Sequence, residues 1–377
     1  MTIGIDIRVL TRGTRTGVEE YTINLLSHLL PLDQNTHYKL FYNSFKKTDI
    51  KYPWFFLNNV KLKDFRVPNR LFFLGARYLK WPKIDKLLGD VDVYFNPHFF
   101  TAPVSSKCKK VIVFHDLSFE HHPEFFSRRK RLWQKALMNT KRDAQNANKI
   151  IASSISTKND LINLYKIDSN KIKVIYLGVG KQFKVQDNNL KLEIIRKKYK
   201  LPKNFILYFG TIEPRKNLVG LIKSFELLRE KIDCNLVIAG SRGWLYNDIL
   251  KTAKNSKYSK NIIFTGFVEE ADKACLYNLA DLFVYPSFFE GFGFPPLEAM
   301  ACGVPTIVSY TSSLPEVVGD SALMIDPYNV DELAWAMEIA LKDLDLRKRL
   351  SQKGIRQAKK FSWQKCAQEV LKTLISW

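Results

Sequence analysis

Short runs rich in β-branched and aromatic residues alternate with longer amphipathic segments, and this alternation limits the fold more than any other feature of the sequence. In the first half the runs are TIGIDIRVL, HYKLFYN, DVDVYFNP, KKVIVFHD, KIIASS and KIKVIYLG. In the second half they are NFILYFGT, CNLVIAG, NIIFTGF, DLFVYPS, VPTIVS and SALMID. Strands that alternate with helices form parallel sheets covered by helices. The sequence therefore predicts an α/β protein with doubly wound parallel sheets.

The pattern starts afresh after Gly180, and 377 residues are too many for one ordinary core. We expect one domain over residues 1–180 and a second over 181–358, with the linker in the polar stretch 181–200. Open parallel sheets bind ligands outside the carboxyl ends of their strands. Two such domains facing a central cleft would hold a ligand between them.

The composition excludes several classes of protein. An apolar content of 46% and an aromatic content of 13% are typical of a globular chain. No apolar run approaches the roughly 20 residues of a membrane span. The first residues, MTIGIDIRVL, lack the basic segment of a signal peptide. The five cysteines are widely spaced without a CxxC, which favours reduced thiols and a cytoplasmic location over a disulfide framework or zinc ribbon.

The net charge of +22 is concentrated in the first half of the chain. Residues 1–180 hold 30 basic and 15 acidic side chains, a balance of +15, and the remainder holds 29 and 22, a balance of +7. Such a surface attracts nucleic acid, anionic membranes or phosphorylated substrates, and plain solubility is the alternative. Aromatic and basic residues interleave in 52–82 and 125–143. These segments are either peripheral attachments to the inner membrane face or helices with a solvated basic side.

The stretch SFFEGFGFPPLEAMACGVPTIVS, residues 287–309, carries the most specific chemistry. It predicts a loop after the strand DLFVYPS and a short helix over 295–302, with Glu290 in the loop and Glu298 in the first turn. Gly291 and Gly293 let the backbone approach a ligand, and free N–H groups at a helix start attract phosphate. Carboxylates accept hydrogen bonds from sugar hydroxyls. The two glutamates together indicate a nucleotide sugar, although stabilisation of the helix dipole would explain Glu298 alone.

A second cluster, YFGTIEPRKN, follows another strand. Arg215 and Lys216 open a helix there, so two cations and free N–H groups meet at one point. This arrangement would hold a diphosphate, the leaving group of sugar transfer, and a solvated basic turn is the alternative.

The first half offers His115, which follows the strand KKVIVFHD and can reach a cleft. Four histidines, including His98, fall within 25 residues, but they lack metal-binding spacing. The D-x-D of Asp90 and Asp92 begins a strand, so we interpret Asp90 as a turn and Asp92 as part of the strand edge. We therefore predict no metal site and no cofactor.

These motifs resemble those of the retaining glycosyltransferases of family 4, which have the two-domain GT-B fold with Rossmann-like domains. The resemblance covers nearly the whole chain and rests on TGVEEYT, DVYFNPHFF, VIVFHDLSF, GTIEPRKN, GFV, the E-x7-E of Glu290 and Glu298, and SSLPEVVGDSALMIDP. The E-x7-E and EPRKN are specific in combination. Within the family the sequence looks most similar to bacterial mannosyltransferase-like enzymes of polysaccharide assembly.

The resemblance implies a role for each site residue. Glu290 would contact hydroxyls of the donor sugar, and His115 would point at the sugar or the developing charge. Glu298 would bind the ribose, while Lys216, aided by Arg215, would neutralise the diphosphate. The other implied donor-binding residues are Gly291, Phe292, Gly293, Phe294, Leu297, Val268 and Gly17.

The same resemblance implies contacts of the backbone with the donor and the course of the last helix. Backbone N–H groups of 292–294 would hold sugar and phosphate, and the base would lie against the backbone of 267–268. Gly17 would let the first helix approach the phosphates, and residues 359–377 would cross back to the first domain. Many family members carry an arginine five positions before the lysine. This chain has Thr211 there, so Arg215 is the candidate for that role.

The resemblance thus implies a retaining glycosyltransferase that transfers a sugar, with GDP-mannose as the expected donor, to a saccharide or lipid-linked acceptor. No metal is needed in that scheme, because side chains supply the cations. The alternatives are a sugar-nucleotide epimerase of the same fold and a basic protein that binds nucleic acid or membrane without catalysis. No recognised nucleic-acid module supports the latter, so nucleic acid is not an expected partner. A dehydrogenase is disfavoured because no G-x-G-x-x-G follows a strand.

Overall fold

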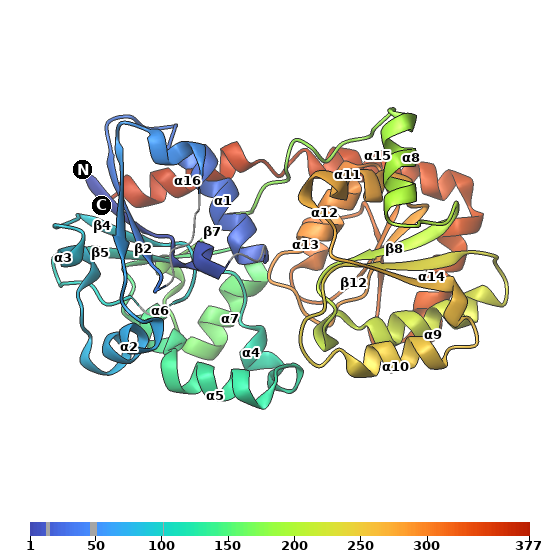
Figure 1. Cartoon of the computed structure of the whole chain (residues 1–377), viewed down its shortest axis with the longest axis horizontal. Coiled ribbons are helices and arrows are strands. Elements are labelled where there is room, and N and C mark those ends of the chain that lie inside the picture. The colour runs from blue at the N-terminus through green and yellow to red at the C-terminus, as the bar shows by residue number, and fades with distance from the viewer. Residues whose placement is uncertain (13–15, 46–50, 101) are drawn as a thin grey trace. The chain divides into compact units, whose positions relative to one another are not determined.

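The computed structural model (Figure 1) describes residues 1–12, 16–45, 51–100 and 102–377. Its chain separates into two compact units. The first contains Met1–Leu117, Arg128–Gly178 and Ser362–Trp377, and the second contains Ser118–Ser127 and Val179–Phe361. The second unit thus includes the short segment Ser118–Ser127, which lies within the first domain expected from the sequence pattern.

A parallel sheet of seven strands, in the order β3-β2-β1-β4-β5-β6-β7, forms the centre of the first unit. The strands are β1 (Thr2–Asp6), β2 (His37–Asn43), β3 (Val60–Phe65), β4 (Val93–Asn96), β5 (Lys109–Phe114), β6 (Lys149–Ala152) and β7 (Ile172–Val174). The chain runs outward on one side of β1 and then returns to β4 on the other. The strand order reverses between β1 and β4, and open sheets bind ligands outside the carboxyl ends of the strands at such a point.

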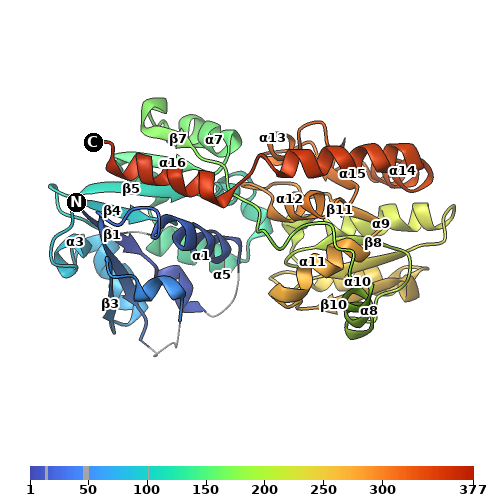
Figure 2. The ribbon, with the colours of Figure 1, turned by 90° about the horizontal axis from the view of Figure 1, so that it is seen from above.

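Helices and short turns surround this sheet. They are η1 (Arg8–Arg12), α1 (Gly17–Leu29), η2 (Pro53–Phe56), α2 (Asn69–Leu74), the π-helical turn η3 (Gly75–Leu79), α3 (Ile84–Leu87), α5 (Arg128–Leu137), α6 (Thr140–Gln145), α7 (Ile155–Tyr165), η5 (Ser169–Lys171) and α16 (Trp363–Ile375). The backbone N–H of Thr16 donates to the Glu19 carboxylate at 2.6 Å, which satisfies a donor at the start of α1. Helix α1 packs against α16, the last helix of the chain (Figure 2).

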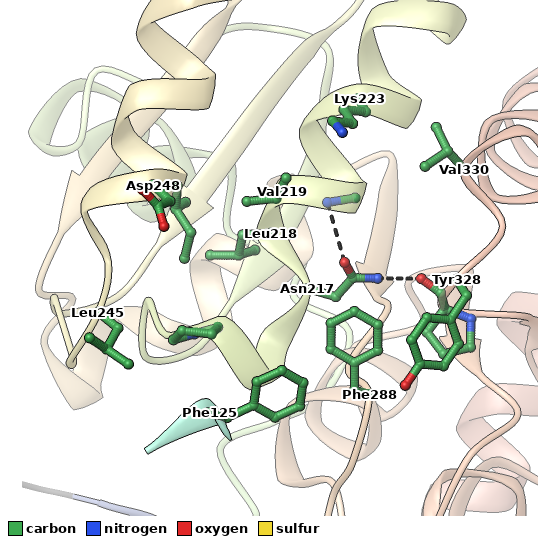
Figure 3. Close-up of a pocket in the computed structure, with 14 residues that line it drawn as sticks. Phe125, Asn217, Leu218, Val219, Lys223, Leu245, Asp248, Phe288, Tyr328 and Val330 are labelled. Carbon is green, nitrogen blue, oxygen red and sulfur yellow. Dashed lines mark hydrogen bonds between the residues drawn. The ribbon is translucent and has the colours of Figure 1, made fainter. Parts of the chain in front are cut away.

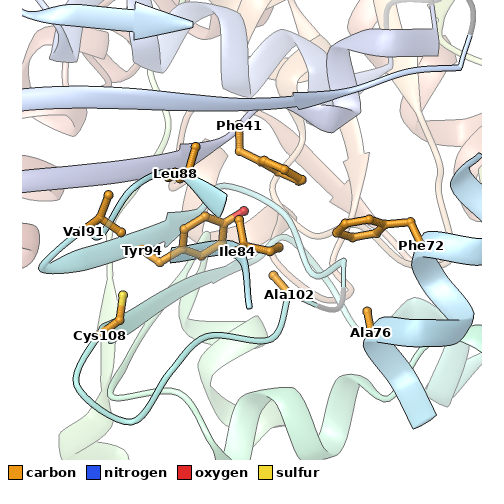
Figure 4. Packing of buried hydrophobic residues seen from close by; sticks show 9 residues of the cluster. All are labelled: Phe41, Phe72, Ala76, Ile84, Leu88, Val91, Tyr94, Ala102 and Cys108. Carbon is orange, nitrogen blue, oxygen red and sulfur yellow. The ribbon is translucent and has the colours of Figure 1, made fainter. Parts of the chain in front are cut away.

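One face of the first sheet is closed by a buried apolar cluster (Figure 4). Its members are Phe41, Phe72, Ala76, Ile84, Leu88, Val91, Tyr94, Ala102 and Cys108. They come from strands, from α2 and its continuation, from α3 and from connecting segments. The cluster therefore ties the segment around α2 to the sheet by apolar burial.

The second unit contains a parallel sheet of six strands in the order β10-β9-β8-β11-β12-β13. The strands are β8 (Phe205–Phe209), β9 (Asn235–Ala239), β10 (Ile262–Gly266), β11 (Leu282–Tyr285), β12 (Thr306–Ser309) and β13 (Leu323–Ile325). All five residues of β8 and all four of β11 are buried, as expected for central parallel strands covered on both faces. The two parallel sheets confirm the predicted fold class.

Helices and short turns accompany the six-stranded sheet of the second unit. They are α4 (Ser118–His121), η4 (Pro123–Phe125), α8 (Asn189–Lys198), η6 (Pro214–Lys216), α9 (Leu218–Arg229), α10 (Asn247–Asn255), η7 (Ser259–Asn261), α11 (Glu270–Leu279), α12 (Phe294–Ala301), α13 (Leu314–Val318), α14 (Val330–Lys342) and α15 (Leu344–Ala358). Helix α9 packs against α14, α12 against α15, and α8 against α11. Helix α8 occupies much of the stretch in which we expected the linker. Among the described residues, no helix is long and apolar enough to cross a membrane.

Candidate active site

The predicted phosphate-binding and glutamate loops meet at one edge of the second sheet. Strands β8 and β11 are neighbours and run parallel, so the loops at their carboxyl ends lie side by side. The first loop leads into η6, which carries Arg215 and Lys216, and the second carries Glu290. The backbone N–H of Phe288 donates to the carbonyl oxygen of Arg215 at 2.9 Å and links the two loops directly.

Glu290 and Lys216 form a buried ion pair at the centre of this site. Lys216 Nζ lies 2.5 Å from Glu290 Oε1 and donates to the Tyr285 hydroxyl at 2.6 Å. The exposed fractions of the two charged residues are only 6% for Lys216 and 7% for Glu290. Tyr285 is the last residue of β11, so the pair is positioned by the rigid sheet as well as by the loops.

Arg215 reaches the same carboxylate from the other side. Its NH1 atom lies 3.2 Å from Glu290 Oε2 and donates to the carbonyl oxygen of Phe289 at 2.6 Å. Its NH2 atom donates to Glu213 at 2.8 Å. The guanidinium is therefore fixed beside Lys216 rather than aimed at solvent, even though position 211 is a threonine.

The charges of the cluster determine its protonation. Burial opposes the ionised form of Glu290, but Lys216 and Arg215 outweigh it and hold the pKa of this carboxyl at about 2. Burial lowers the pKa of Lys216, as does Arg215, while Glu290 opposes that change. Glu290 is an anion at neutral pH. Two cations and the carboxylates of Glu213 and Glu290 thus compensate one another within the site.

Serine side chains hold the glutamate loop in shape. The backbone N–H of Glu290 donates to Ser312 Oγ at 2.8 Å, and Ser313 Oγ lies 2.9 Å from the carbonyl oxygens of both Glu290 and Phe292. Ser309 Oγ donates to the carbonyl oxygen of Ser287 at 2.6 Å. Ser309 ends β12, and Ser312 and Ser313 open the motif SSLPEVVGDSALMIDP, but sequence reasoning gave none of these serines a role in the site.

Gly293 caps the start of α12 in a left-handed conformation with a φ of 109°. A Cβ atom at this position would come within 2.8 Å of Leu314 Cδ2. Both observations explain why this turn requires glycine. Phe292 beside it is buried, and its ring contacts those of Phe294 and Phe361 at 5.7 and 5.8 Å.

The predicted place of Glu298 in the first turn is wrong, because the helix begins one residue earlier than expected. Helix α12 begins at Phe294, so Glu298 is its fifth residue and the first turn holds no acidic residue. The alternative that Glu298 stabilises the helix start therefore fails, because the dipole effect is confined to the first turn. Its carboxylate instead accepts a hydrogen bond from the Tyr277 hydroxyl at 2.8 Å. Burial raises the pKa of Tyr277 far above its usual value, so this hydroxyl stays a neutral donor.

The other predicted donor-binding residues of the second unit are mostly internal. Gly291 is buried, Leu297 is fully buried, and Val268 is 2% exposed. Phe267 next to it, just past the end of β10, is 68% exposed. Leu297 packs into the core and can offer a ligand little side-chain surface.

An aromatic pocket of about 360 Å³ lies behind η6 at the start of α9 (Figure 3). Phe288 forms its wall, with its ring 5.3 Å from that of Phe125 and 4.8 Å from that of Tyr328. Asn217 accepts a hydrogen bond from the Gly220 N–H at 3.3 Å and so caps α9. Arg215, Lys216 and Glu290 do not line this pocket. Pro214 and Asn217, on either side of the two cationic residues, contribute to its lining.

His115 and Gly17 belong to the first unit. Gly17 is the exposed first residue of α1. His115 Nε2 lies 2.9 Å from the carbonyl oxygen of Pro97, so this nitrogen carries the proton. Burial lowers the pKa of His115 to about 4, which makes the imidazole neutral at physiological pH. Among the residues that the structure describes, no three histidine, cysteine or acidic side chains gather in a metal-binding arrangement.

Family models match both halves of the chain. Residues 15–182 match "Glycosyltransferase Family 4", and residues 191–357 match "Glycosyl transferases group 1". A relative from Escherichia coli, "O-antigen chain mannosyltransferase B", is 30% identical over 370 residues, which cover 94% of this chain and 95% of the relative.

Two solved structures show the same fold. WaaG, "a glycosyltransferase involved in lipopolysaccharide biosynthesis", has a TM-score of 0.76 at 16% identity, with all of both chains covered. HepE from Anabaena, solved "in complex with UDP and glucose", has a TM-score of 0.73 at 19% identity, again with all of both chains covered. The fold is therefore GT-B, as the resemblance predicted, and at 30% identity over nearly its whole length the chain belongs to glycosyltransferase family 4.

Proposed function

We propose that this glycosyltransferase transfers mannose from GDP-mannose to a saccharide or lipid-linked acceptor during polysaccharide assembly, with retention of the anomeric configuration. The observation that carries the proposal is the buried cluster of Arg215, Lys216 and Glu290 at the carboxyl edge of the sheet. The name of the E. coli relative supports mannose as the sugar. The HepE complex with UDP and glucose supports a nucleotide-sugar donor.

The cluster suggests an exchange of ion-pair partners when the donor binds. A diphosphate beside Lys216 and Arg215 offers these cations a doubly charged partner. Glu290 would then leave Lys216 and accept hydrogen bonds from hydroxyls of the donor sugar. As the sugar departs, charge develops on the diphosphate, and the two cations stabilise it without a metal.

The remaining residues position the donor around this centre. Glu298 binds the ribose hydroxyls, and Tyr277 keeps its carboxylate oriented. Backbone N–H groups of 292–294 hold the sugar and phosphate, and the base lies against the backbone of 267–268, where Phe267 is exposed. Gly291 and Leu297 shape the loop and helix behind these contacts.

His115 and Gly17 contribute from the first unit. Gly17 leaves the start of α1 open to phosphate oxygens. The neutral His115 acts as a hydrogen-bonding group for the sugar rather than as a cation, because its pKa lies at about 4. The acceptor hydroxyl attacks on the face that the diphosphate leaves, which gives retention.

Thermal unfolding with GDP, UDP, ADP and their sugar conjugates, in the presence of a chelator, tests the donor site. A ligand at 100 times its Kd adds about 2.7 kcal/mol to the stability of the native state. We expect the midpoint to rise with the GDP series, and to rise less in Lys216→Met. The matched control Lys251→Met removes an exposed lysine of α10 and should respond like the wild type. No shift with any nucleotide would refute the donor site.

Product analysis with GDP-mannose separates transfer from the other reactions of this fold. Mannose should appear on an added acceptor with the α-configuration of the donor. Release of free nucleotide with an altered sugar, in the absence of any acceptor, would identify an epimerase instead.

A further inference from the structure

Besides the aromatic pocket of the second unit, a polar pocket lies in the first unit. It is at the edge of the sheet opposite to the carboxyl ends of the strands, where a ligand is expected. Lys110, the second residue of β5, and Asn148, just before β6, place it at the amino ends of the strands. Its volume is about 370 Å³. Its lining comes from η3 and the residues after it, from the segment 102–110 and from the segment 139–148. Nothing in the proposed reaction uses it.

The lining is strongly basic. It contains five cationic side chains, Arg77, Lys80, Lys83, Lys110 and Arg142, and one carboxylate, Asp143. Lys110 Nζ pairs with Asp143 at 3.0 Å. Within the described part of the chain, the structure records no ion pair for Lys80, Lys83 or Arg142. Unneutralised cations around a concave surface favour an anion with several acceptor oxygens, such as a phosphate.

The pocket has a rigid floor and rim. Its floor includes Ala76, Ala102 and Cys108 of the buried cluster in Figure 4. On the rim, Arg77 donates to the carbonyl oxygen of Met138 at 2.9 Å. Tyr78 of the same π-helical turn donates to that of Ala136 at 3.1 Å. These bonds tie η3 to the end of α5, so the pocket is formed before any ligand arrives.

Exposed apolar side chains stand on the two helices that carry this rim. They are Leu71, Leu74, Tyr78, Leu79 and Trp81 around α2 and η3, and Leu132 and Trp133 on α5. Leu79, Trp81 and Leu132 have exposed fractions of 74%, 67% and 69%. The rings of Phe73 and Trp133 lie 6.2 Å apart, which places α2 and α5 against each other. A cluster of this kind on a solvent-exposed face marks an interaction surface.

We propose that this pocket binds the phosphate headgroup of an anionic lipid while the apolar side chains beside it enter the bilayer. Leucine, tryptophan and tyrosine suit the boundary between headgroups and acyl chains, and nearby lysine and arginine attract anionic lipid. Long basic side chains can also lie along the apolar surface and keep their charge at the headgroups. A basic face that merely keeps the protein in solution would account for the charge, but not for the exposed leucines and tryptophans among the cations.

Vesicle sedimentation of the full-length protein tests the proposal without any sugar donor, so its failure is distinct from a failure of the proposed function. Vesicles of phosphatidylcholine alone are compared with vesicles in which about one third of the lipid is phosphatidylglycerol. The test variant is Lys80→Gln with Lys83→Gln and Arg142→Gln. The control removes three exposed lysines of the second unit by Lys203→Gln, Lys251→Gln and Lys254→Gln, the same change in net charge.

The wild type should bind the anionic vesicles and bind neutral ones weakly. Each cation near a membrane contributes roughly fivefold, so the triple test variant should lose about 100-fold in partitioning. The control should lose less than roughly threefold, because its lysines lie elsewhere. Leu79→Ser with Trp81→Ser should lose roughly tenfold without a change in charge. If the triple variant unfolds, the exposed Arg142→Gln alone should still reduce binding by roughly fivefold.

Two further sets of measurements distinguish binding in the pocket from diffuse charge attraction and from binding of a soluble phosphate. Vesicles of equal charge made with oleate, a carboxylate lipid, should bind more weakly than those with phosphatidylglycerol. Equal binding to both, or equal losses in test and control variants, would show diffuse attraction and overturn the pocket. Stabilisation of the wild type, but not the triple variant, by inorganic phosphate with no vesicle binding would assign the site to a soluble phosphate and overturn the lipid.

Discussion

Replacing Glu290 by glutamine should tighten the binding of a nucleoside diphosphate while slowing sugar transfer. Glu290 is the partner of both Lys216 and Arg215, so the two cations lose their nearest anion while the shape of the side chain is kept. The pKa of Glu290 lies at about 2 instead of 4.5. At about 1.4 kcal/mol for each pH unit, the surroundings favour the carboxylate by about 3 kcal/mol.

This free energy should appear first as lost stability. The wild type should exceed Glu290→Gln in its free energy of unfolding by about 3 kcal/mol at pH 7. A carboxyl with a lowered native pKa stabilises above its unfolded pKa, so the difference should persist above pH 4.5 and fade as the pH drops towards 2. Urea unfolding at pH 7 and at about pH 3 measures both values.

A diphosphate that restores half of this stabilisation would bind the variant about tenfold more tightly. Isothermal titration with GDP measures the affinity, and a radiolabelled transfer assay measures kcat. Glu298→Gln is the matched control: it is a glutamate with the same exposed fraction of 7%, but its carboxylate accepts from the Tyr277 hydroxyl rather than from a lysine. It should weaken GDP binding. Unchanged or weaker GDP binding in Glu290→Gln that is folded under the assay conditions would refute the exchange of partners.

Three further outcomes are expected. Ser313→Ala should cost about 1–3 kcal/mol of stability by urea unfolding and raise KM for the donor, because two loop carbonyls lose the hydroxyl that they share. An unchanged KM would contradict its role in shaping the loop. Gly293→Ala should be destabilised by roughly 1–3 kcal/mol, because its φ is positive and its new methyl group would meet Leu314. Gly266→Ala is the control: its φ is also positive but no neighbour lies within 4 Å, so it should lose less stability. Burial lowers the native pKa of His115 to about 4, so the wild type should lose up to about 3 kcal/mol of stability as the pH falls from 6.5 to 4, and His115→Gln should lack this loss. Parallel stability profiles of the two proteins between these pH values would refute the buried neutral histidine.

The sequence was sufficient to predict the two parallel sheets, because central strands leave nearly continuous apolar runs and helices leave periodic ones. The resemblance implied that Arg215, Lys216 and Glu290 surround one donor. In the structure they lie together because β8 and β11 are neighbours and the loops at their carboxyl ends share one edge of the sheet.

Other parts of the site depend on contacts that the chain makes over long separations. Tyr277, the partner of Glu298, lies in α11, and no local pattern marks it. Ser313 lies in the motif SSLPEVVGDSALMIDP, but the motif does not show that its hydroxyl bonds to the glutamate loop. Helix α12 begins at Phe294, one residue before the expected proline, and this small shift moves Glu298 out of the first turn. Boundaries of this kind depend on the cap residue, here the left-handed Gly293, rather than on periodicity.

The membership of α16 in the first unit has a consequence for how the protein is made. A ribosome completes β1 to β7 early, but the helix that packs on α1 is translated only after the entire second unit. A Cβ at Gly178 would lie 2.1 Å from the backbone nitrogen of Trp363, so the two chain segments must meet closely at that junction. Domains fold as units during synthesis. During synthesis of the second unit, one side of α1 in the first unit therefore remains exposed. Chaperone binding to stalled nascent chains should decrease once α16 has left the exit tunnel.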